Sequence, residues 1–310
     1  MNAPTMKAVI CTQYGGPEVL KIEEVAKPTP RDNEILIKIV ASSVNSGDVR
    51  VRALAVEGFL RIIMRFVLGF RKPRKPILGV AFSGIVEQTG RYTKDFKVGD
   101  EVYGITGFQF GTYAEYIAVS EKSVIYKKPI NATFEEAAAL PFGGQTAIYF
   151  LEKAQIIQRK NPKVLIYGAT GAVGSSAIQL SKYHNAEVTA VCSEGGKSLA
   201  LELGADEVVF YTQEDFTQTN EKFDIIFDAV GKITKKQCRH LLNENGSFVT
   251  VGGLEFAPDR VEQLQFLREL FEKGNYKAAI DRVYPMEEIV EAHRYVESGR
   301  KKGNVVLRIA

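Results

Sequence analysis

Cysteine and histidine are scarce in this sequence of 310 residues, which contains only three of each. Cys11, Cys192 and Cys238 lie far apart along the chain. Neither a disulfide framework nor a closely spaced zinc knuckle can be built from cysteines placed in this way. We therefore expect a reduced, cytoplasmic protein.

The sequence also lacks a large excess of charge of either sign. Its 40 basic and 37 acidic residues give a formal charge of +3, too small a surplus to imply nucleic acid or a membrane as an obligatory partner. The first residues contain no apolar core of signal-peptide length, so we do not expect export. The length suits about two soluble domains, and a small-molecule ligand is the better expectation.

No long apolar run is free of charged residues. The nearest approach, residues 54–70, is apolar except for Glu57, Arg61 and Arg65, which are spaced four apart on one helical stripe. About 17 residues with two arginines inside are short and costly as a membrane span. We predict a helix buried on most sides, supported by a Glu-to-Arg pair and packed over a substrate cleft or a subunit interface. A peripheral membrane contact through residues 54–75 is the alternative.

The first part of the chain has the pattern of a compact β-rich domain. Residues 34–40 alternate apolar and polar side chains with the period of a half-buried strand. Further short runs of strand-forming residues lie at 84–87, 100–104 and 113–119, with turn residues between them.

After Pro129 the pattern changes to alternating helices and strands. Thr133 can cap a helix, and Glu136 can complete a capping box with it. Runs that are apolar throughout, with helical stretches between them, predict a doubly wound parallel sheet covered on both faces. These runs lie at residues 164–167, 187–191, 207–210, 223–227 and 247–251. A helix at 286–298 and a strand at 305–309 close the chain, and periodicity leaves open which domain they complete.

A glycine-rich turn follows the first of these strands and opens a helix that continues to Lys182. A pyrophosphate needs backbone N–H donors at a helix N-terminus, and glycines let the chain turn tightly and approach it. Because a strand precedes the turn and a βαβ spacing follows it, we predict dinucleotide binding, with a turn that holds no ligand as the alternative. The turn consists of Gly168, Ala169, Thr170, Gly171, Ala172, Val173 and Gly174.

The end of the second strand bears on which cofactor is bound. Glu194 lies about 20 residues beyond the glycines, where an acid could accept from the free 2′-hydroxyl of NAD. Ser193 and Lys197 offer a hydroxyl and a cation to a 2′-phosphate instead. We favour NADPH and keep NADH open; a solvated glutamate and a solvated lysine are the alternatives for these two charged residues.

Six further segments stand in a fixed order along the chain: YGGPEVL at 14–20, VNSGD at 44–48, FKVGDEVYG at 96–104, LGADEV at 203–208, FDAVG at 227–231 and GRKKG at 299–303. With the glycine turn, they make nearly all of the sequence resemble one family. This is the zinc-independent quinone oxidoreductase branch of the medium-chain dehydrogenase/reductase superfamily, the relatives of zeta-crystallin.

The resemblance implies an α/β protein with two domains and, as a further expectation, a homodimer. A GroES-like β-rich catalytic domain would comprise residues 1–122 and 271–310, and a Rossmann dinucleotide-binding domain residues 123–270, with the active site in the cleft. The resemblance also implies cofactor-binding residues beyond the glycine turn. They are Asn45, Thr146, Gly252 and Gly253 near the nicotinamide, and Ser193, Lys197 and Tyr211 near the adenosine phosphate.

No metal is expected. Zinc-dependent relatives have a cysteine three residues before the aspartate that corresponds to Asp48, and a Gly-His-Glu later. This chain has Asn45 at the first place and Gly79-Val80-Ala81 at the second, and neither offers the soft or imidazole ligand that zinc prefers. We interpret the three histidines, which fall within predicted helices, as ordinary structural or surface residues. They are His184, His240 and His293.

Without a metal, reduction of a conjugated acceptor is easier than oxidation of an alcohol, which needs a base for the hydroxyl proton. Charge then builds on the conjugated oxygen, where hydrogen-bond donors stabilise it. The Asn45 amide is our candidate donor, and a turn-forming asparagine that binds its own backbone is an equal alternative. The final proton can come from water.

The expected acceptor is a small quinone. A 2-alkenal, an enone or an enoyl thioester would use the same hydride geometry with a different pocket. A third hypothesis, from another class, is a non-catalytic NADPH-binding or nucleic-acid-binding protein. The near-neutral charge of the chain argues against nucleic-acid binding, whereas the basic run from Arg71 to Lys75 favours it.

Overall fold

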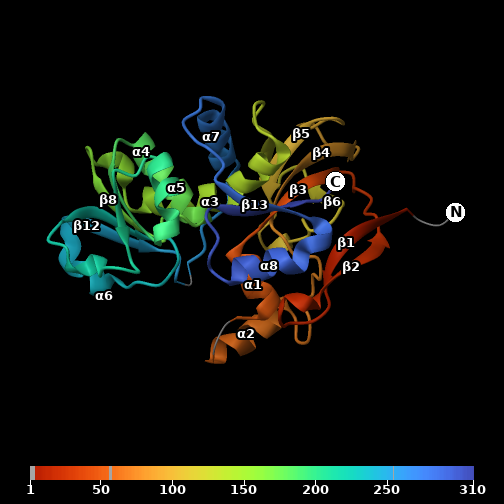
Figure 1. The fold of residues 1–310 in the computed structure, drawn as a ribbon. Helices are drawn as coiled ribbons and strands as arrows, with labels where there is room; N and C mark the ends of the chain where they lie inside the picture. The colour runs from red at the N-terminus through yellow and green to blue at the C-terminus, as the bar shows by residue number, and fades with distance from the viewer. Residues whose placement is uncertain (1–3, 56–57, 254) are drawn as a thin grey trace. The chain divides into compact units, whose positions relative to one another are not determined.

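The computed structural model describes residues 4–55, 58–253 and 255–310, with residues 59–61 and 63 described by their backbone alone. Two compact units divide the chain (Figure 1). One consists of Met1–Pro141 and Ile280–Ala310, and the other of Phe142–Ala279. The divisions therefore fall later along the chain than the predicted ones after residues 122 and 270. The first of them lies inside one long helix, α3 (Phe134–Lys153).

The first unit is built on a seven-stranded sheet in the order β13-β14-β3-β4-β5-β7, with β6 also paired to β3, and a two-stranded sheet of β1 and β2. Strand β14 pairs antiparallel with β3, so the C-terminal tail completes this unit. The strands are β1 (Thr5–Cys11), β2 (Leu20–Ala26), β3 (Glu34–Val44), β4 (Ala81–Thr89), β5 (Glu101–Ile105), β6 (Tyr116–Ser120), β7 (Val124–Lys127), β13 (Ile280–Pro285) and β14 (Asn304–Arg308).

Alternation along β3 builds the core of this unit. Ile35, Ile37 and Ile39 are fully buried and Lys38 is exposed, but Leu36 on the opposite side of the strand is buried as well. Three helices accompany the sheet: α1 (Ser46–Ala53), α2 (Gly58–Leu68) and α8 (Ile289–Glu297). The period-two pattern of the sequence therefore does mark a strand, although both of its faces are covered along much of its length.

The second unit contains a five-stranded sheet in the order β10-β9-β8-β11-β12, in which all neighbours are parallel. This is the Rossmann order 3-2-1-4-5, so the predicted doubly wound fold is confirmed. The strands are β8 (Lys163–Tyr167), β9 (Glu187–Cys192), β10 (Glu207–Phe210), β11 (Phe223–Asp228) and β12 (Leu242–Thr250). The helices are α4 (Ala172–Tyr183), α5 (Lys197–Glu202), α6 (Lys235–Cys238) and α7 (Val261–Glu272), together with the second half of α3.

The predicted capping box at the start of α3 is confirmed. The Glu136 carboxylate accepts from the Thr133 N–H at 2.8 Å, and the Glu136 N–H donates to Thr133 Oγ1 at 3.1 Å. Two of the amides that would lack partners at the helix start are thereby paired.

The helix predicted over residues 54–70 is shorter in the structure. Leu54 takes a left-handed conformation with φ 47° at the end of α1, so the helix that follows is limited to α2. Three large apolar side chains of α2, Ile62, Phe66 and Val67, are about half exposed, as is Phe70 just beyond its end. Among the described side chains of α2, Leu68 is buried and Met64 is half-buried. The expected Glu57–Arg61 pair lies outside the described residues. Among the described residues, no helix is both long and apolar enough to cross a bilayer.

Candidate dinucleotide site

The glycine turn joins β8 to α4 at the carboxyl edge of the parallel sheet. The N–H groups of Gly168 and Ala169 both donate to the Val191 carbonyl of neighbouring β9, at 2.9 and 3.1 Å. The Gly171 N–H donates to the Gly168 carbonyl at 3.1 Å. These bonds hold the turn against the sheet.

Two glycines of the turn are required by packing, and one is not. Gly168 has φ +74°, and a Cβ there would lie 2.5 Å from a Val230 methyl group. A Cβ at Gly174 would lie 2.2 Å from the Gly168 carbonyl oxygen. A Cβ at Gly171 would meet only one atom within 4 Å, at 3.6 Å, and its φ of −79° suits any residue. Gly171 therefore borders open space.

The N-terminus of α4 carries no side-chain cap, because its N-cap residue is Gly171. By helix geometry the amides of Ala172, Val173 and Gly174 have no carbonyl partner one turn back inside the helix. The helix dipole adds partial positive charge at this end. Free amides, that charge and open space beside Gly171 fit a diphosphate group.

The segment after β9 lies against the glycine turn. A Cβ at Gly196 would lie 2.8 Å from Thr170 Oγ1, so the Gly196 backbone packs against the Thr170 side chain. Ser193 is half-buried at the end of β9, and Lys197 begins α5 with an exposed side chain. The structure thus brings Thr170, Ser193 and Lys197 to one edge of the sheet.

Glu194 and Lys197 differ in what already binds them. The Glu194 carboxylate accepts a hydrogen bond from the Gln213 amide in the segment after β10. The Lys197 ammonium lies 5.9 Å from the centre of the Phe210 ring, and no ion pair among the described residues includes it. The acid that could select NAD is therefore engaged, whereas the lysine remains open to an anion.

A cavity of about 380 Å³ adjoins this edge. Its aromatic walls are Tyr167, Tyr211 and Phe216, with the Tyr167 ring 6.1 Å from Tyr211 and 5.4 Å from Phe216. Burial raises the pKa of Tyr167 above its usual value. Aromatic faces of this kind can stack on a planar base. Sequence reasoning identified Tyr211 alone, although Tyr167 immediately precedes the glycine turn.

Asp228 organises the ends of β11 and β12 and was missed as a site residue. Its fully buried carboxylate accepts from Gly231 N–H at 2.8 Å and from Thr250 Oγ1 at 2.8 Å. The Gly252 N–H in turn donates to Thr250 Oγ1 at 2.9 Å. A Cβ on Gly231 would lie 2.6 Å from the Gly252 Cα, so the backbones of the two loops are in contact at these glycines. The FDAVG segment at 227–231, which contains Asp228, was the sequence feature that could have identified it.

Thr146 lies on α3, near the start of α4. A Cβ at Gly143, one turn earlier, would lie 2.3 Å from the Ala172 carbonyl oxygen, so the two helix backbones are in contact there. The Thr146 hydroxyl donates to the Phe142 carbonyl at 2.7 Å, which leaves its oxygen free to accept.

In the first unit, Asn45 is held at the N-terminus of α1. Its N–H donates to Asp48 Oδ2 at 2.9 Å, and its side-chain Nδ2 donates to Ser43 Oγ at 3.0 Å. Asn45 Oδ1 is buried without a hydrogen-bond partner among the described residues. Asn45 Nδ2 also donates to the Ser43 carbonyl at 3.4 Å, so the side chain makes the local backbone contact expected of a turn-forming asparagine.

Behind Asn45 lies a buried polar cluster that sequence reasoning did not find. Asp48 Oδ2 accepts from the Tyr113 hydroxyl at 3.0 Å, and the Tyr113 ring contacts the His293 ring edge-on at 5.7 Å. Burial raises the pKa of Asp48 to about 6, against the opposing effect of its hydrogen bonds. Burial, with the Arg52 charge nearby, lowers the pKa of His293 to about 3. His293 is therefore neutral in the fold.

The other two histidines lie at the surface or at a helix end. His184 is the C-terminal cap of α4, and His240 lies exposed in a short 3-10 turn. The places of the zinc ligands of zinc-dependent relatives hold Asn45, Val80 and Ala81, a donor set that does not fit zinc. No group of three or more His, Cys, Asp or Glu side chains suited to a metal occurs among the described residues.

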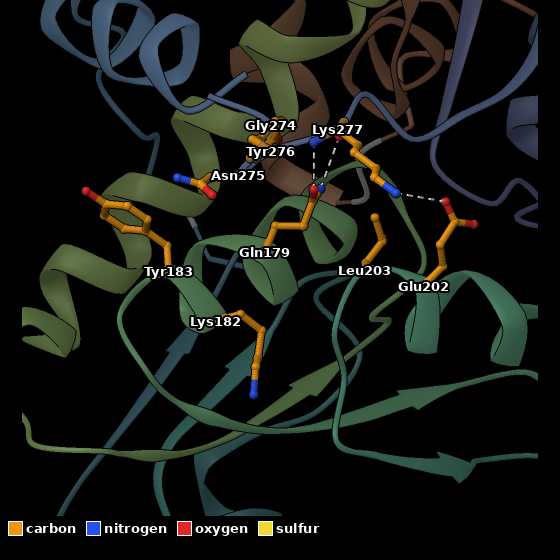
Figure 2. Close-up of a pocket in the computed structure, with 9 residues that line it drawn as sticks. All are labelled: Gln179, Lys182, Tyr183, Glu202, Leu203, Gly274, Asn275, Tyr276 and Lys277. Atoms are coloured by element: carbon orange, nitrogen blue, oxygen red, sulfur yellow. Dashed lines mark hydrogen bonds and ion pairs between the residues drawn. The ribbon is translucent and has the colours of Figure 1, made fainter. Parts of the chain in front are cut away.

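A second cavity, of about 410 Å³, lies near the C-terminal end of α4 (Figure 2). Gln179 points at Lys277, accepting from its N–H at 2.7 Å and donating to its carbonyl at 3.1 Å. The Lys277 ammonium reaches Glu202 at 3.5 Å. Gln179 lies two helical turns beyond the glycine turn. This cavity is therefore separate from the diphosphate cradle.

The fold and the cradle define a dinucleotide-binding unit joined to a β-rich unit, the architecture of medium-chain dehydrogenases and reductases. The alcohol dehydrogenase GroES-like domain family matches residues 31–129, and the zinc-binding dehydrogenase family matches residues 172–281. The chain belongs to the zinc-independent quinone oxidoreductase branch of the medium-chain dehydrogenase/reductase superfamily.

Three similar proteins illustrate that membership. The chain is 37% identical to 2-methylene-furan-3-one reductase of Solanum lycopersicum, over 97% of this chain and 79% of that protein. It is 32% identical to the chloroplastic NADPH-dependent alkenal/one oxidoreductase of Arabidopsis thaliana, over the same shares. The solved quinone oxidoreductase of Coxiella burnetii superposes with a TM-score of 0.89 at 30% identity, covering 99% of this chain and 100% of that one.

Proposed function

We propose that this protein is an NADPH-dependent oxidoreductase that reduces a quinone or another conjugated carbonyl compound without a metal. The observation that carries the proposal is the uncapped N-terminus of α4 beside the open space at Gly171. The names of the similar proteins supply the reaction class, since they describe reductases of enones, alkenals and quinones.

The residues proposed to hold the cofactor form three groups. Those for the diphosphate are Gly168, Thr170, Gly171, Ala172, Val173 and Gly174. Those for the adenosine phosphate are Ser193, Lys197 and Tyr211. Those for the nicotinamide are Asn45, Thr146, Gly252 and Gly253.

When bound, NADPH supplies a hydride for an electrophilic carbon of the acceptor. The contribution of the chain is to orient both partners and to stabilise the negative charge that develops on the acceptor oxygen. Asn45 is the proposed donor to that oxygen. Its backbone is held by Asp48, and its Nδ2 donates to both the hydroxyl and the carbonyl of Ser43. Donation to the acceptor therefore requires the side chain to exchange the longer of these bonds, at 3.4 Å, for the acceptor oxygen. The final proton comes from water.

An enone or alkenal is the second candidate for the acceptor, favoured by the higher identity to the two enone and alkenal reductases. The test is NADPH consumption, followed by absorbance, with a panel of quinones, 2-alkenals, cyclic enones and enoyl thioesters. We expect turnover with at least one class. Tight NADPH binding with no turnover on any member would instead support a non-catalytic NADPH-binding protein.

The metal-free reaction predicts that chelation has no effect. Treatment with EDTA should leave NADPH consumption unchanged, and elemental analysis should find no stoichiometric zinc, because the residues at the zinc-ligand positions are unsuitable donors. Activity that disappears with EDTA and returns with added zinc would contradict this. The cytoplasmic location and the homodimer stay predictions from the sequence.

A further inference from the structure

Helix α2 has more apolar surface than its own unit covers. Its inner face packs Leu68, and part of Met64, against a small cluster that includes Leu54 and Phe110. The Tyr14 hydroxyl donates to the Gly69 carbonyl at 2.9 Å and ties down the end of the helix. These contacts anchor α2 along one side only.

The outer face of α2 is apolar and open. On the helix, Ile62, Phe66 and Val67 are 52%, 57% and 57% exposed, and Phe70, two residues beyond the helix end, is 56% exposed. The rings of Phe66 and Phe70 contact edge to face, with centroids 4.9 Å apart. Large apolar side chains gathered on and just after one helix mark an interaction surface, because a soluble chain rarely exposes such a cluster without a partner.

Positive charge surrounds these apolar side chains. The sequence from residue 58 to residue 86 contains six basic residues and no acidic one. Among them are Arg65 on the helix and a basic run just after it, at residues 71–75, all with exposed side chains. Among the residues that the structure describes, no ion pair involves Arg65 or the basic side chains at residues 71–75.

We propose that the outer face of α2 and the basic run after it dock on an anionic lipid membrane surface. The exposed aromatic and aliphatic side chains would enter the boundary between headgroups and acyl chains, and the arginines and lysines would meet the lipid phosphates and carboxylates. At 11 residues, α2 lies in the interface and does not span it.

Charge and polarity favour this occupant over two others. A second copy on a twofold axis would bring the same positive surface against itself, where like charges repel. Nucleic acid would use the cations but leave the apolar side chains exposed to water. Membrane docking stands apart from the proposed catalysis, and it would bring the β-rich unit to the phase in which lipophilic quinones dissolve.

The test is sedimentation of the full chain, without cofactor, with sucrose-loaded vesicles. We expect the protein to pellet with vesicles of equal parts phosphatidylcholine and phosphatidylserine, and to pellet far less with phosphatidylcholine alone or at high salt. Two variants separate the apolar and the electrostatic contributions to vesicle binding. Ile62→Ser with Phe66→Ser removes two of the exposed apolar side chains, and Arg71→Glu with Lys72→Glu reverses two of the positive charges. Each should lower the partition coefficient by at least about tenfold.

The matched control is Val98→Ser with Lys97→Glu, an exposed apolar and basic pair elsewhere in the same unit. It should pellet as the native chain does. Far-UV circular dichroism and the melting temperature confirm that all three variants fold. Failure of the native chain to bind anionic vesicles, or equal binding by the Ile62/Phe66 variant, would overturn the proposal. So would gel filtration in which that variant converts an oligomer to a monomer while vesicle binding is absent.

Discussion

At the scale of single residues, two buried groups behind Asn45 titrate in opposite directions. The pKa of Asp48 is raised by burial from 3.8 to about 6, so its stabilising contribution is full below about pH 4 and is lost as the pH rises through 6. The pKa of His293 is lowered from 6.5 to about 3. Its contribution is present above about pH 6.5 and is lost as the pH falls toward 3.

Asp48 and His293 change the stability in opposite directions as the pH rises, so Asp48→Asn should leave the pH dependence due to His293 visible. The variant can still accept from Tyr113, and it avoids the cost of ionising a buried carboxylate, about 3 kcal/mol at neutral pH. As the pH is raised from about 4 to about 6, we expect the urea concentration at the unfolding midpoint of the variant to increase. The midpoint of the native chain should change less over the same range. Asp32→Asn, at an exposed position, is the control. Parallel pH profiles for Asp48→Asn and the native chain would be inconsistent with this account.

The pair Glu194 and Lys197 should set cofactor preference. The native chain should favour NADPH in kcat/KM, and Lys197→Glu should lower the NADPH value by about 10- to 100-fold, the effect of losing a charge-assisted bond. Gln213→Ala should release Glu194 and improve use of NADH. Lys160→Glu, an exposed lysine elsewhere in the second unit, controls for net charge. Equal use of both nucleotides by the native chain would refute the preference.

At the scale of elements, local patterns predicted most strands and helices because those patterns report local physics. The five apolar runs correspond to β8 to β12, and the glycine turn stands between β8 and α4 as expected. The helix predicted over residues 54–70 is shorter in the structure, because periodicity reports an apolar face and not the left-handed residue, Leu54, that ends the preceding helix. Gln213 and Asp228 escaped notice because their partners, Glu194 and the loops after β11 and β12, lie close only in the folded chain.

The start of α4 offers a test of what its missing cap is for. Gly171→Asp has room for the side chain and a φ that aspartate adopts readily, so it should supply the absent N-cap. We expect the variant to be more stable than the native chain by about 0.5 to 1 kcal/mol, from the cap and the helix dipole together, seen as a rise in melting temperature. A lower melting temperature would mean that the helix start is not open as described.

At the scale of the whole molecule, two units with different sheets were predictable, but the place of the tail was not predictable from periodicity. Strand β14 joins β3 through pairing between residues far apart in sequence. Such a contact leaves no local pattern, because each strand alone would suit any sheet with a free edge. Only the family resemblance connected the tail with the first unit.

The account depends on the α4 N-terminus as the cradle for a diphosphate, and isothermal calorimetry of NADPH with the native chain and Gly171→Asp tests it most directly. We predict one NADPH bound per native chain. The equally or more stable variant should bind at least about 100-fold more weakly, because its carboxylate occupies the amides and repels the phosphates. Unchanged affinity in Gly171→Asp, or no binding of NADPH or NADH to the native chain at millimolar concentration, would contradict the account.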